Sequence, residues 1–96
     1  MRESALQAFI VKYLSDKGWL VIHIPNQLSR GRLTAAGILP GAPDLIALKN
    51  GQCVFIEVKA AGGRLSEKQA YIHELIKKQG FEVIVARSLD DVKSLP

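Results

Sequence analysis

The dipeptide Asn50-Gly51 lies between two runs of strand-forming residues and constrains the fold more than any other feature of the sequence. Asn-Gly is the strongest short-range signal for a two-residue type I′ hairpin turn, because both residues tolerate positive φ. The flanking runs are DLIALK, residues 44–49, and QCVFIEVKA, residues 52–60. We therefore expect two antiparallel strands whose opposed residues are fixed by the short turn.

The remaining segments predict an α/β domain around this hairpin. Apolar residues at helical spacing before Gly18 predict a helix over residues 3–17. The sequence SEKQ fits a capping box, in which Ser66 caps a helix that ends at Gly80 and Gln69 reaches back to the Ser66 backbone. Strand-rich runs precede the hairpin and follow this helix, and they are WLVIHIP, residues 19–25, and FEVIVAR, residues 81–87.

The predicted order is helix, three strands, helix and strand, with a short C-terminal helix after Ser88. A strand, a helix and a strand in succession favour a right-handed crossover to a parallel neighbour, and the apolar FEVIVAR run is typical of a strand covered on both faces. We expect a mixed sheet of about four strands flanked by helices. Residues 26–43 predict a long loop, and a loop of this length is uncommon unless it is functional.

Length and composition indicate a single globular domain over residues 1–96. Hydrophobic residues make up 48% of the chain, and no apolar run approaches the roughly 20 residues of a membrane span. The sequence has no signal-peptide core and no glycine-rich phosphate loop, so we expect a cytoplasmic protein with no membrane association and no nucleotide cofactor. A net charge of +4 permits a polyanionic partner such as nucleic acid.

Two acids, Asp44 and Glu57, lie within the otherwise apolar strands of the hairpin. Counting outward from the turn places them directly opposite each other in a non-hydrogen-bonded pair, with Cβ atoms roughly 4.5 to 5.5 Å apart. The alternation of strand side chains puts Lys59 on the same face. Opposed carboxylates destabilise a sheet unless a cation compensates, and they are a suitable donor set for Mg²⁺. The alternative is a surface ion cluster that contributes little to stability.

Cysteine and histidine have structural interpretations in this sequence. Cys53 cannot form an internal disulfide, because it is the single cysteine, and its neighbours indicate a small strand residue. His23 and His73 are far apart in the sequence and have no partner at metal-ligand spacing. We therefore expect no zinc site and a structural role for both histidines.

The acids belong to a longer pattern, in which Pro43-Asp44 is followed by Glu57-Val58-Lys59. This pattern resembles the PD-(D/E)xK nuclease superfamily, which includes type II restriction enzymes and Holliday-junction resolvases. The stretches GAPDLIAL, VFIEVKAAGGRLSEKQ and GFEVIVARS together resemble the VRR-NUC family, the virus-type replication and repair nucleases, over nearly the whole chain. The resemblance implies a restriction-endonuclease-like α/β core and a metal-dependent nuclease.

The resemblance also implies a role for each motif residue. Asp44 and Glu57 would bind Mg²⁺ or Mn²⁺ together with the backbone carbonyl of Val58. Lys59 would orient the attacking water or neutralise charge on the scissile phosphate.

Two further residues, Gln69 and Glu3, are implied by the resemblance to assist the metal site. Gln69 would hold Lys59 or the water, although a capping-box residue without chemistry is the alternative. Glu3 would add a direct or outer carboxylate, although an acid is also favourable at any helix start. Basic residues near the site are candidates for contacts to DNA phosphates, with solvated charges as the alternative; they are Arg30, Arg32, Arg64 and Lys68.

These features together predict a metal-dependent DNA endonuclease. By the family resemblance, we expect a phage- or prophage-encoded enzyme that acts in a bacterial host as a homodimer and resolves four-way junctions. Flap cutting, nicking or general duplex cleavage would use the same catalytic residues. Two hypotheses from different functional classes stand beside the nuclease, namely a catalytically silent DNA-binding module and a structural protein whose acids bind a cation.

Overall fold

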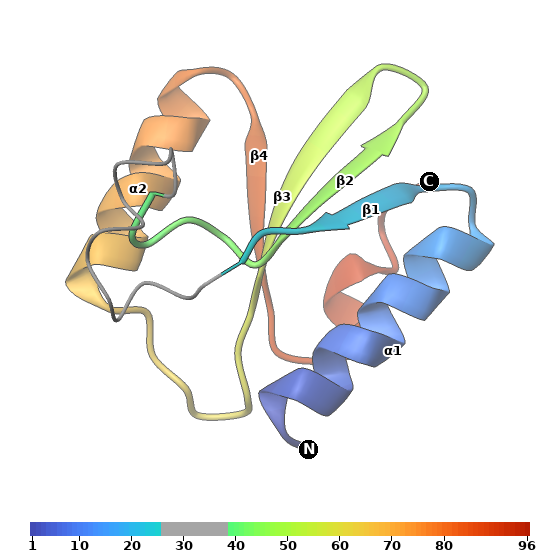
Figure 1. Ribbon diagram of the computed structural model, residues 1–96, viewed down its shortest axis with the longest axis horizontal. Helices are drawn as coiled ribbons and strands as arrows, with labels where there is room; N and C mark the ends of the chain where they lie inside the picture. The colour runs from blue at the N-terminus through green and yellow to red at the C-terminus, as the bar shows by residue number, and fades with distance from the viewer. Residues whose placement is uncertain (26–38) are drawn as a thin grey trace.

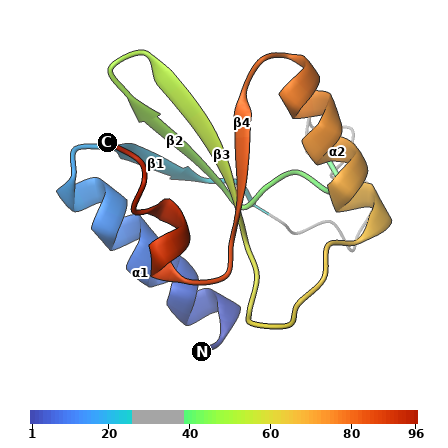
Figure 2. The same ribbon diagram turned by 180° about the vertical axis from the view of Figure 1, so that it is seen from behind.

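The computed structural model describes residues 1–25 and 39–96, in which a sheet lies between two helical layers (Figures 1 and 2). In chain order the elements are α1 (Glu3–Asp16), β1 (Leu20–His23), β2 (Leu45–Lys49), β3 (Gln52–Val58), α2 (Glu67–Lys78), β4 (Glu82–Ala86) and the 3₁₀ helix η2 (Leu89–Val92). This order confirms the predicted α/β fold, and η2 is the predicted C-terminal helix. No helix among the described residues is long and apolar enough to cross a membrane.

The hairpin of β2 and β3 has the register that its two-residue turn predicts. Both turn residues have positive φ, 49° at Asn50 and 81° at Gly51. The strand order is β1-β2-β3-β4, and β1 pairs antiparallel with β2. The opposed residues of the hairpin run from Lys49 and Gln52 at the turn to Leu45 and Ile56 at the open end.

Strand β4 lies parallel to β3, as the crossover through α2 predicts. It contacts both α2 and η2, yet Ala86 is the one buried residue in its burial pattern. An edge position explains why β4 is covered less completely than the apolar FEVIVAR run predicts. The parallel alignment also brings the C-terminal ends of β3 and β4 to the same edge of the sheet.

The main apolar core lies between the sheet and α1, while α2 lies on the opposite side of the sheet (Figures 1 and 2). Helix α1 contributes Leu6, Ile10 and Leu14 to this core, all buried and at helical spacing. Strand β3 contributes its alternate residues, which are Val54, Ile56 and Val58. Since these alternate side chains face α1, Glu57 between them faces the α2 side of the sheet.

Gly41 allows the segment before β2 to pass closely against the first turn of α2. Its φ is +88°, and a Cβ atom built on it would lie 2.8 Å from Lys68 Cγ and 2.9 Å from the Lys68 carbonyl oxygen. A side chain at this position would strain the backbone and displace α2 from the segment that carries Asp44.

We expect Gly41→Ala to lower the free energy of unfolding by more than the about 1–2 kcal/mol that a left-handed conformation alone costs. Gly80→Ala is the matched control, because Gly80 has a φ of +95° but open space where its Cβ would lie. Urea denaturation of both variants measures the difference. Equal losses in the two variants would show that the approach to Lys68 has no energetic consequence.

Candidate active site

The two predicted acids meet at the C-terminal end of β3. Asp44 directly precedes β2, so the hairpin ladder has the predicted register but ends at Leu45 and Ile56, one pair short of the predicted pairing of Asp44 with Glu57. The Asp44 carbonyl oxygen accepts a hydrogen bond from the Ile24 N–H at 2.7 Å, which ties this bend to the end of β1. Its Oδ2 accepts a hydrogen bond from the Val58 N–H at 2.7 Å. The Asp44 carboxylate is therefore held against the β3 backbone beside Glu57.

Helix α2 contacts both oxygens of the Glu57 carboxyl group. Glu57 is buried, with 2% of its side chain exposed. Gln69 Nε2 donates to Glu57 Oε2 at 3.5 Å, and His73 Nε2 lies 3.0 Å from Glu57 Oε1. Gln69 and His73 are four residues apart and so share one face of α2, one turn from each other. This pair fixes the orientation of the Glu57 side chain.

Gln69 has both a capping role and a contact within the site. The Ser66 N–H donates to Gln69 Oε1 at 2.9 Å, and the Gln69 N–H donates to Ser66 Oγ at 3.1 Å. These two bonds form the predicted capping box. Because the amide oxygen is engaged with the cap, the Nε2 group of Gln69 is directed toward Glu57.

Burial and neighbouring acids disfavour the ionised form of Glu57. Desolvation is the largest cause, and the hydrogen bond and charge of Asp44 follow. Lys59 opposes these effects, whereas Glu3 adds to them. Together these effects raise the pKa of Glu57 to about 8. The acid pair therefore retains a proton near neutral pH unless a cation compensates the charge.

His73 is uncharged beside this carboxyl group. Burial lowers the pKa of His73 below its ordinary value of 6.5, and the charges of Lys77 and Lys59 lower it further. In the tautomer that carries the proton on Nε2, the neutral imidazole would donate to Glu57 Oε1. The sequence predicts a structural role for His73, and the structure places it in direct contact with the candidate site.

The donor set fits a small divalent cation. Mg²⁺ takes hard oxygen ligands and is commonly held by one or two carboxylates, with water and phosphate at the remaining positions. Asp44, Glu57 and the Val58 carbonyl offer such oxygens, and a cation would compensate the charge that burial disfavours at Glu57. No group of three or more His, Cys, Asp and Glu side chains in the described residues is arranged to bind a metal. An ion held by this small set would keep positions open for water and phosphate.

Lys59 and Glu3 lie at the edge of the acid pair. The Lys59 N–H donates to the Ala86 carbonyl at 3.0 Å, which continues the pairing of β3 with β4. The Ala60 N–H donates to Glu3 Oε2 at 3.3 Å, so the first turn of α1 reaches the segment that follows β3. This position fits an outer role for Glu3 better than direct coordination, since no three-acid cluster forms among the described residues.

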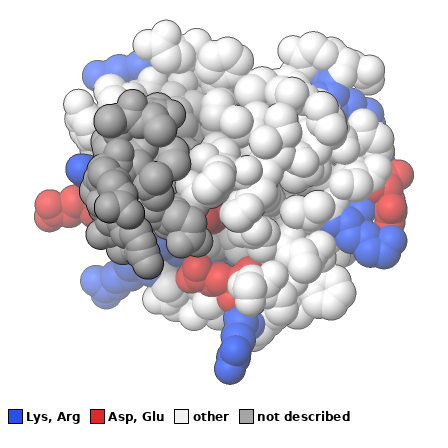
Figure 3. Space-filling view, viewed as in Figure 1, with Lys and Arg blue, Asp and Glu red and all other residues white. Residues whose placement is uncertain are grey.

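The predicted DNA-binding residues are only partly described. Arg64 and Lys68 are exposed, on the segment that enters α2 and on the first turn of that helix, whereas Arg30 and Arg32 lie outside the described residues. On the face shown in Figure 3, acidic side chains gather near the start of α1 and the segment leading to α2, with Lys and Arg side chains beside them. Basic groups therefore flank an acidic centre on this face.

The sequence interpretation missed one further basic residue near the site. Arg87 directly follows β4, and its Nη1 donates to the Gly63 carbonyl in the turn beyond β3. The parallel pairing of Val58 with Ala86 brings Arg87 to the same sheet edge as Lys59. The predicted β3-α2-β4 crossover is the signal that could have identified it.

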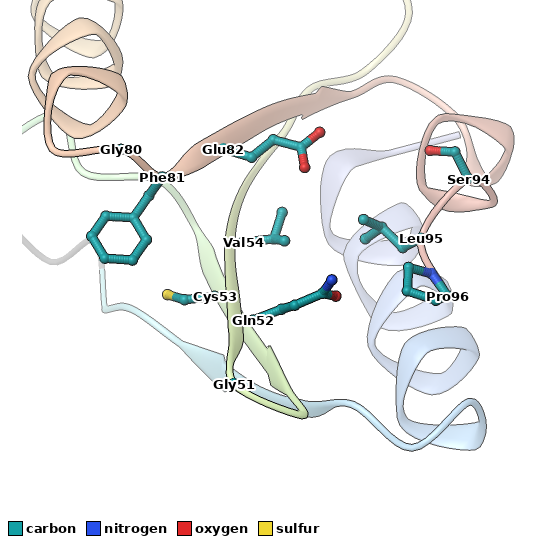
Figure 4. Close-up of a pocket in the computed structure, with 10 residues that line it drawn as sticks. All are labelled: Gly51, Gln52, Cys53, Val54, Gly80, Phe81, Glu82, Ser94, Leu95 and Pro96. Carbon is teal, nitrogen blue, oxygen red and sulfur yellow. The ribbon is translucent and has the colours of Figure 1, made fainter.

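A pocket of about 540 Å³ at the other end of β3 is a different feature (Figure 4). Its lining residues come from the hairpin turn, the start of β4 and the C-terminus, and they are Gly51, Gln52, Cys53, Val54, Gly80, Phe81, Glu82, Ser94, Leu95 and Pro96. Glu82 is the one carboxylate side chain among them. This pocket therefore lacks the paired acids that distinguish the site at the C-terminal end of β3.

Comparison with known proteins identifies the family. The profile of the VRR-NUC domain matches residues 22–90, a segment that includes Asp44, Glu57, Lys59 and His73 but not Glu3. The chain belongs to the VRR-NUC family. One solved structure described as a VRR-NUC domain is 29% identical, with a TM-score of 0.72 over 97% of this chain and 91% of the other. A second, described as a VRR-NUC domain protein, shares the fold with a TM-score of 0.79 at 22% identity, over 99% of this chain and 84% of the other.

This VRR-NUC chain is also similar to two curated proteins named crossover junction endodeoxyribonuclease Hjc. The protein from Sulfurisphaera tokodaii is 33% identical over an alignment of 93 residues, and the match covers 92% of this chain and 60% of the relative. The protein from Sulfolobus acidocaldarius is 33% identical over an alignment of 98 residues, and the match covers 96% of this chain and 64% of the relative. The chain thus spans less than two thirds of the length of these relatives.

Proposed function

We propose that this VRR-NUC chain is a metal-dependent endonuclease that hydrolyses phosphodiester bonds in DNA and prefers four-way junctions. The observation that carries the proposal is the buried Glu57 carboxyl group, held beside Asp44 and near Lys59 at the end of β3. Family membership and the two relatives named crossover junction endodeoxyribonucleases support this assignment.

The residues of the site would divide the work of phosphodiester hydrolysis. Bound Mg²⁺ or Mn²⁺ would polarise the scissile phosphodiester and lower the pKa of a bound water. Asp44, Glu57 and the Val58 carbonyl would hold the cation. Lys59 would stabilise negative charge on the phosphate. Gln69, fixed by the capping box, would hold the Glu57 carboxylate in place, and this contact supports a role beyond capping.

We further propose that the enzyme acts on junctions as a homodimer. Two sites related by a two-fold axis would cut two strands of a four-way junction symmetrically. Basic residues on the substrate side would contact phosphates and make binding salt-dependent; the proposed contacts are Arg64 and Lys68, together with Arg30 and Arg32. A cytoplasmic location, a single domain over residues 1–96 and a phage or prophage origin remain predictions.

A substrate comparison tests the proposed activity. We expect the wild-type protein to cut labelled four-way junctions at least about tenfold faster than flap, nicked or linear duplex DNA, with Mg²⁺ or Mn²⁺ and not with EDTA. Equal cutting of all four DNAs would contradict the junction preference and leave a general nuclease. Faster cutting of the flap DNA would favour a flap nuclease with the same site, and single-strand cuts in the linear duplex would favour a nicking nuclease. If the protein binds DNA but does not cut it with Mg²⁺ or with Mn²⁺, it is a catalytically silent binding module.

A further inference from the structure

We propose that His73 is a positioning residue, which holds the carboxyl group of Glu57 in the orientation that binds the divalent cation. This inference rests on the proposed nuclease function and adds a residue to its metal site. His73 would act through Glu57 and would contact neither the cation nor the DNA.

The contact between His73 and Glu57 is short and sheltered from water. His73 Nε2 lies 3.0 Å from Glu57 Oε1, and the two side chains are 3% and 2% exposed. A hydrogen bond in such a place is not exchanged with solvent, so it restrains the side chains that it joins. The atom that His73 holds belongs to the carboxyl group proposed to bind the cation.

Residues on two successive turns of helix α2 contact the two carboxyl oxygens of Glu57. Gln69 contacts Oε2, and His73 contacts Oε1. A glutamate side chain has several rotatable bonds, and freezing it in the metal-binding orientation costs conformational entropy. Two donors on one helix face, each directed at a different oxygen, fix the Glu57 side chain during folding. The entropy is therefore lost before any cation binds. Partners of this kind around metal ligands commonly change metal affinity about 10- to 100-fold.

The position of His73 on α2 makes an apolar role a poor explanation. Its neighbour Ile72 is also buried and is an ordinary apolar residue of the helix. A polar ring in a buried place costs free energy unless it is hydrogen-bonded, and the bond shown by His73 is to Glu57. The remaining structural explanation is that His73 only satisfies a buried acid, and metal binding distinguishes that explanation from positioning.

Metal binding by the full chain without DNA tests the inference. We expect His73→Leu to weaken Mn²⁺ binding about 10- to 100-fold in calorimetric titration, because Glu57 loses one of its two donors. His73→Gln, which keeps a donor, should recover part of the affinity. His23→Leu is the matched control, because His23 is an exposed residue of β1, and it should bind Mn²⁺ like the wild type.

A second measurement keeps the inference testable if His73→Leu does not fold. In ¹⁵N-histidine-labelled wild-type protein, NMR should show His73 protonated on Nε2, and its signals should shift with the midpoint of Mg²⁺ binding. Wild-type Mn²⁺ affinity in folded His73→Leu, or His73 signals that do not respond to saturating Mg²⁺, would overturn the positioning role alone. A wild-type protein that binds neither metal and cuts no DNA would overturn the proposed function as well.

Discussion

Replacing Asp44 with asparagine is expected to abolish metal-dependent cutting while the protein remains folded. Asparagine keeps an oxygen that can accept the hydrogen bond from the Val58 N–H, which Asp44 Oδ2 accepts at 2.7 Å. It removes the negative charge that would hold the cation. Metal stabilisation of the transition state amounts to several kcal/mol, and about 4 kcal/mol corresponds to roughly a thousandfold in rate. Single-turnover cutting of a labelled junction measures this loss.

Asp16→Asn provides the matched control for this substitution. Asp16 is an exposed residue of α1 that pairs with Lys12 at 3.0 Å, and 65% of its side chain is accessible. The same chemical change there removes one surface charge without touching the site, so cutting should remain at the wild-type rate. Wild-type cutting by a folded Asp44→Asn variant would show that Asp44 is not part of the metal site.

The hairpin shows which parts of the site could be predicted from sequence. A two-residue Asn50-Gly51 turn fixes the register of every following pair, so local turn chemistry was enough to place Glu57 and Lys59 at one end of the hairpin. The same register also placed Asp44 near Glu57, but the bend that takes Asp44 out of the ladder could not be predicted from the turn. The bend depends on a backbone hydrogen bond to Ile24, a contact between segments far apart in the chain.

Helix α2 likewise has features that follow from local sequence and features that depend on packing. The SEKQ sequence predicts the capping box because both of its bonds are local. Helical periodicity also places Gln69 and His73 on one face. It does not reveal which face meets Glu57, because that depends on how α2 crosses the sheet. Local sequence was therefore enough to find the cap, whereas the packing of α2 was needed to find the role of His73.

The structure also explains why acids lie among apolar strand residues. The strand fixes the place of Glu57 between core residues that face α1, and α2 covers the opposite side. The burial that fixes this geometry also raises the pKa of Glu57 to about 8. The same features that organise the site therefore make it costly to ionise without a cation, and this cost is measurable in the metal-free protein.

In EDTA, the free energy of unfolding is expected to fall by about 2 kcal/mol as pH rises from about 6.5 to about 8. Folded Glu57, with its pKa raised above the ordinary 4.5, keeps a proton in this range that the unfolded chain has already released. Stability from this proton is complete below about pH 4.5 and is lost as pH rises through about 8. The lowered pKa of His73 has the opposite effect below pH 6.5, so the effect of Glu57 is clearest above that value.

Urea denaturation at several pH values measures this slope, and Glu57→Gln is the decisive variant. Glutamine imitates the protonated carboxyl group, so the variant should be more stable than the wild type near pH 8 and should lose most of the slope. Saturating Mg²⁺ should stabilise the wild type most at the higher pH, where the cation replaces the lost proton, and should not stabilise Glu57→Gln. A wild-type slope that persists unchanged in Glu57→Gln would assign the titration to another group. An identical response of both proteins to Mg²⁺ would show that Glu57 does not bind the cation.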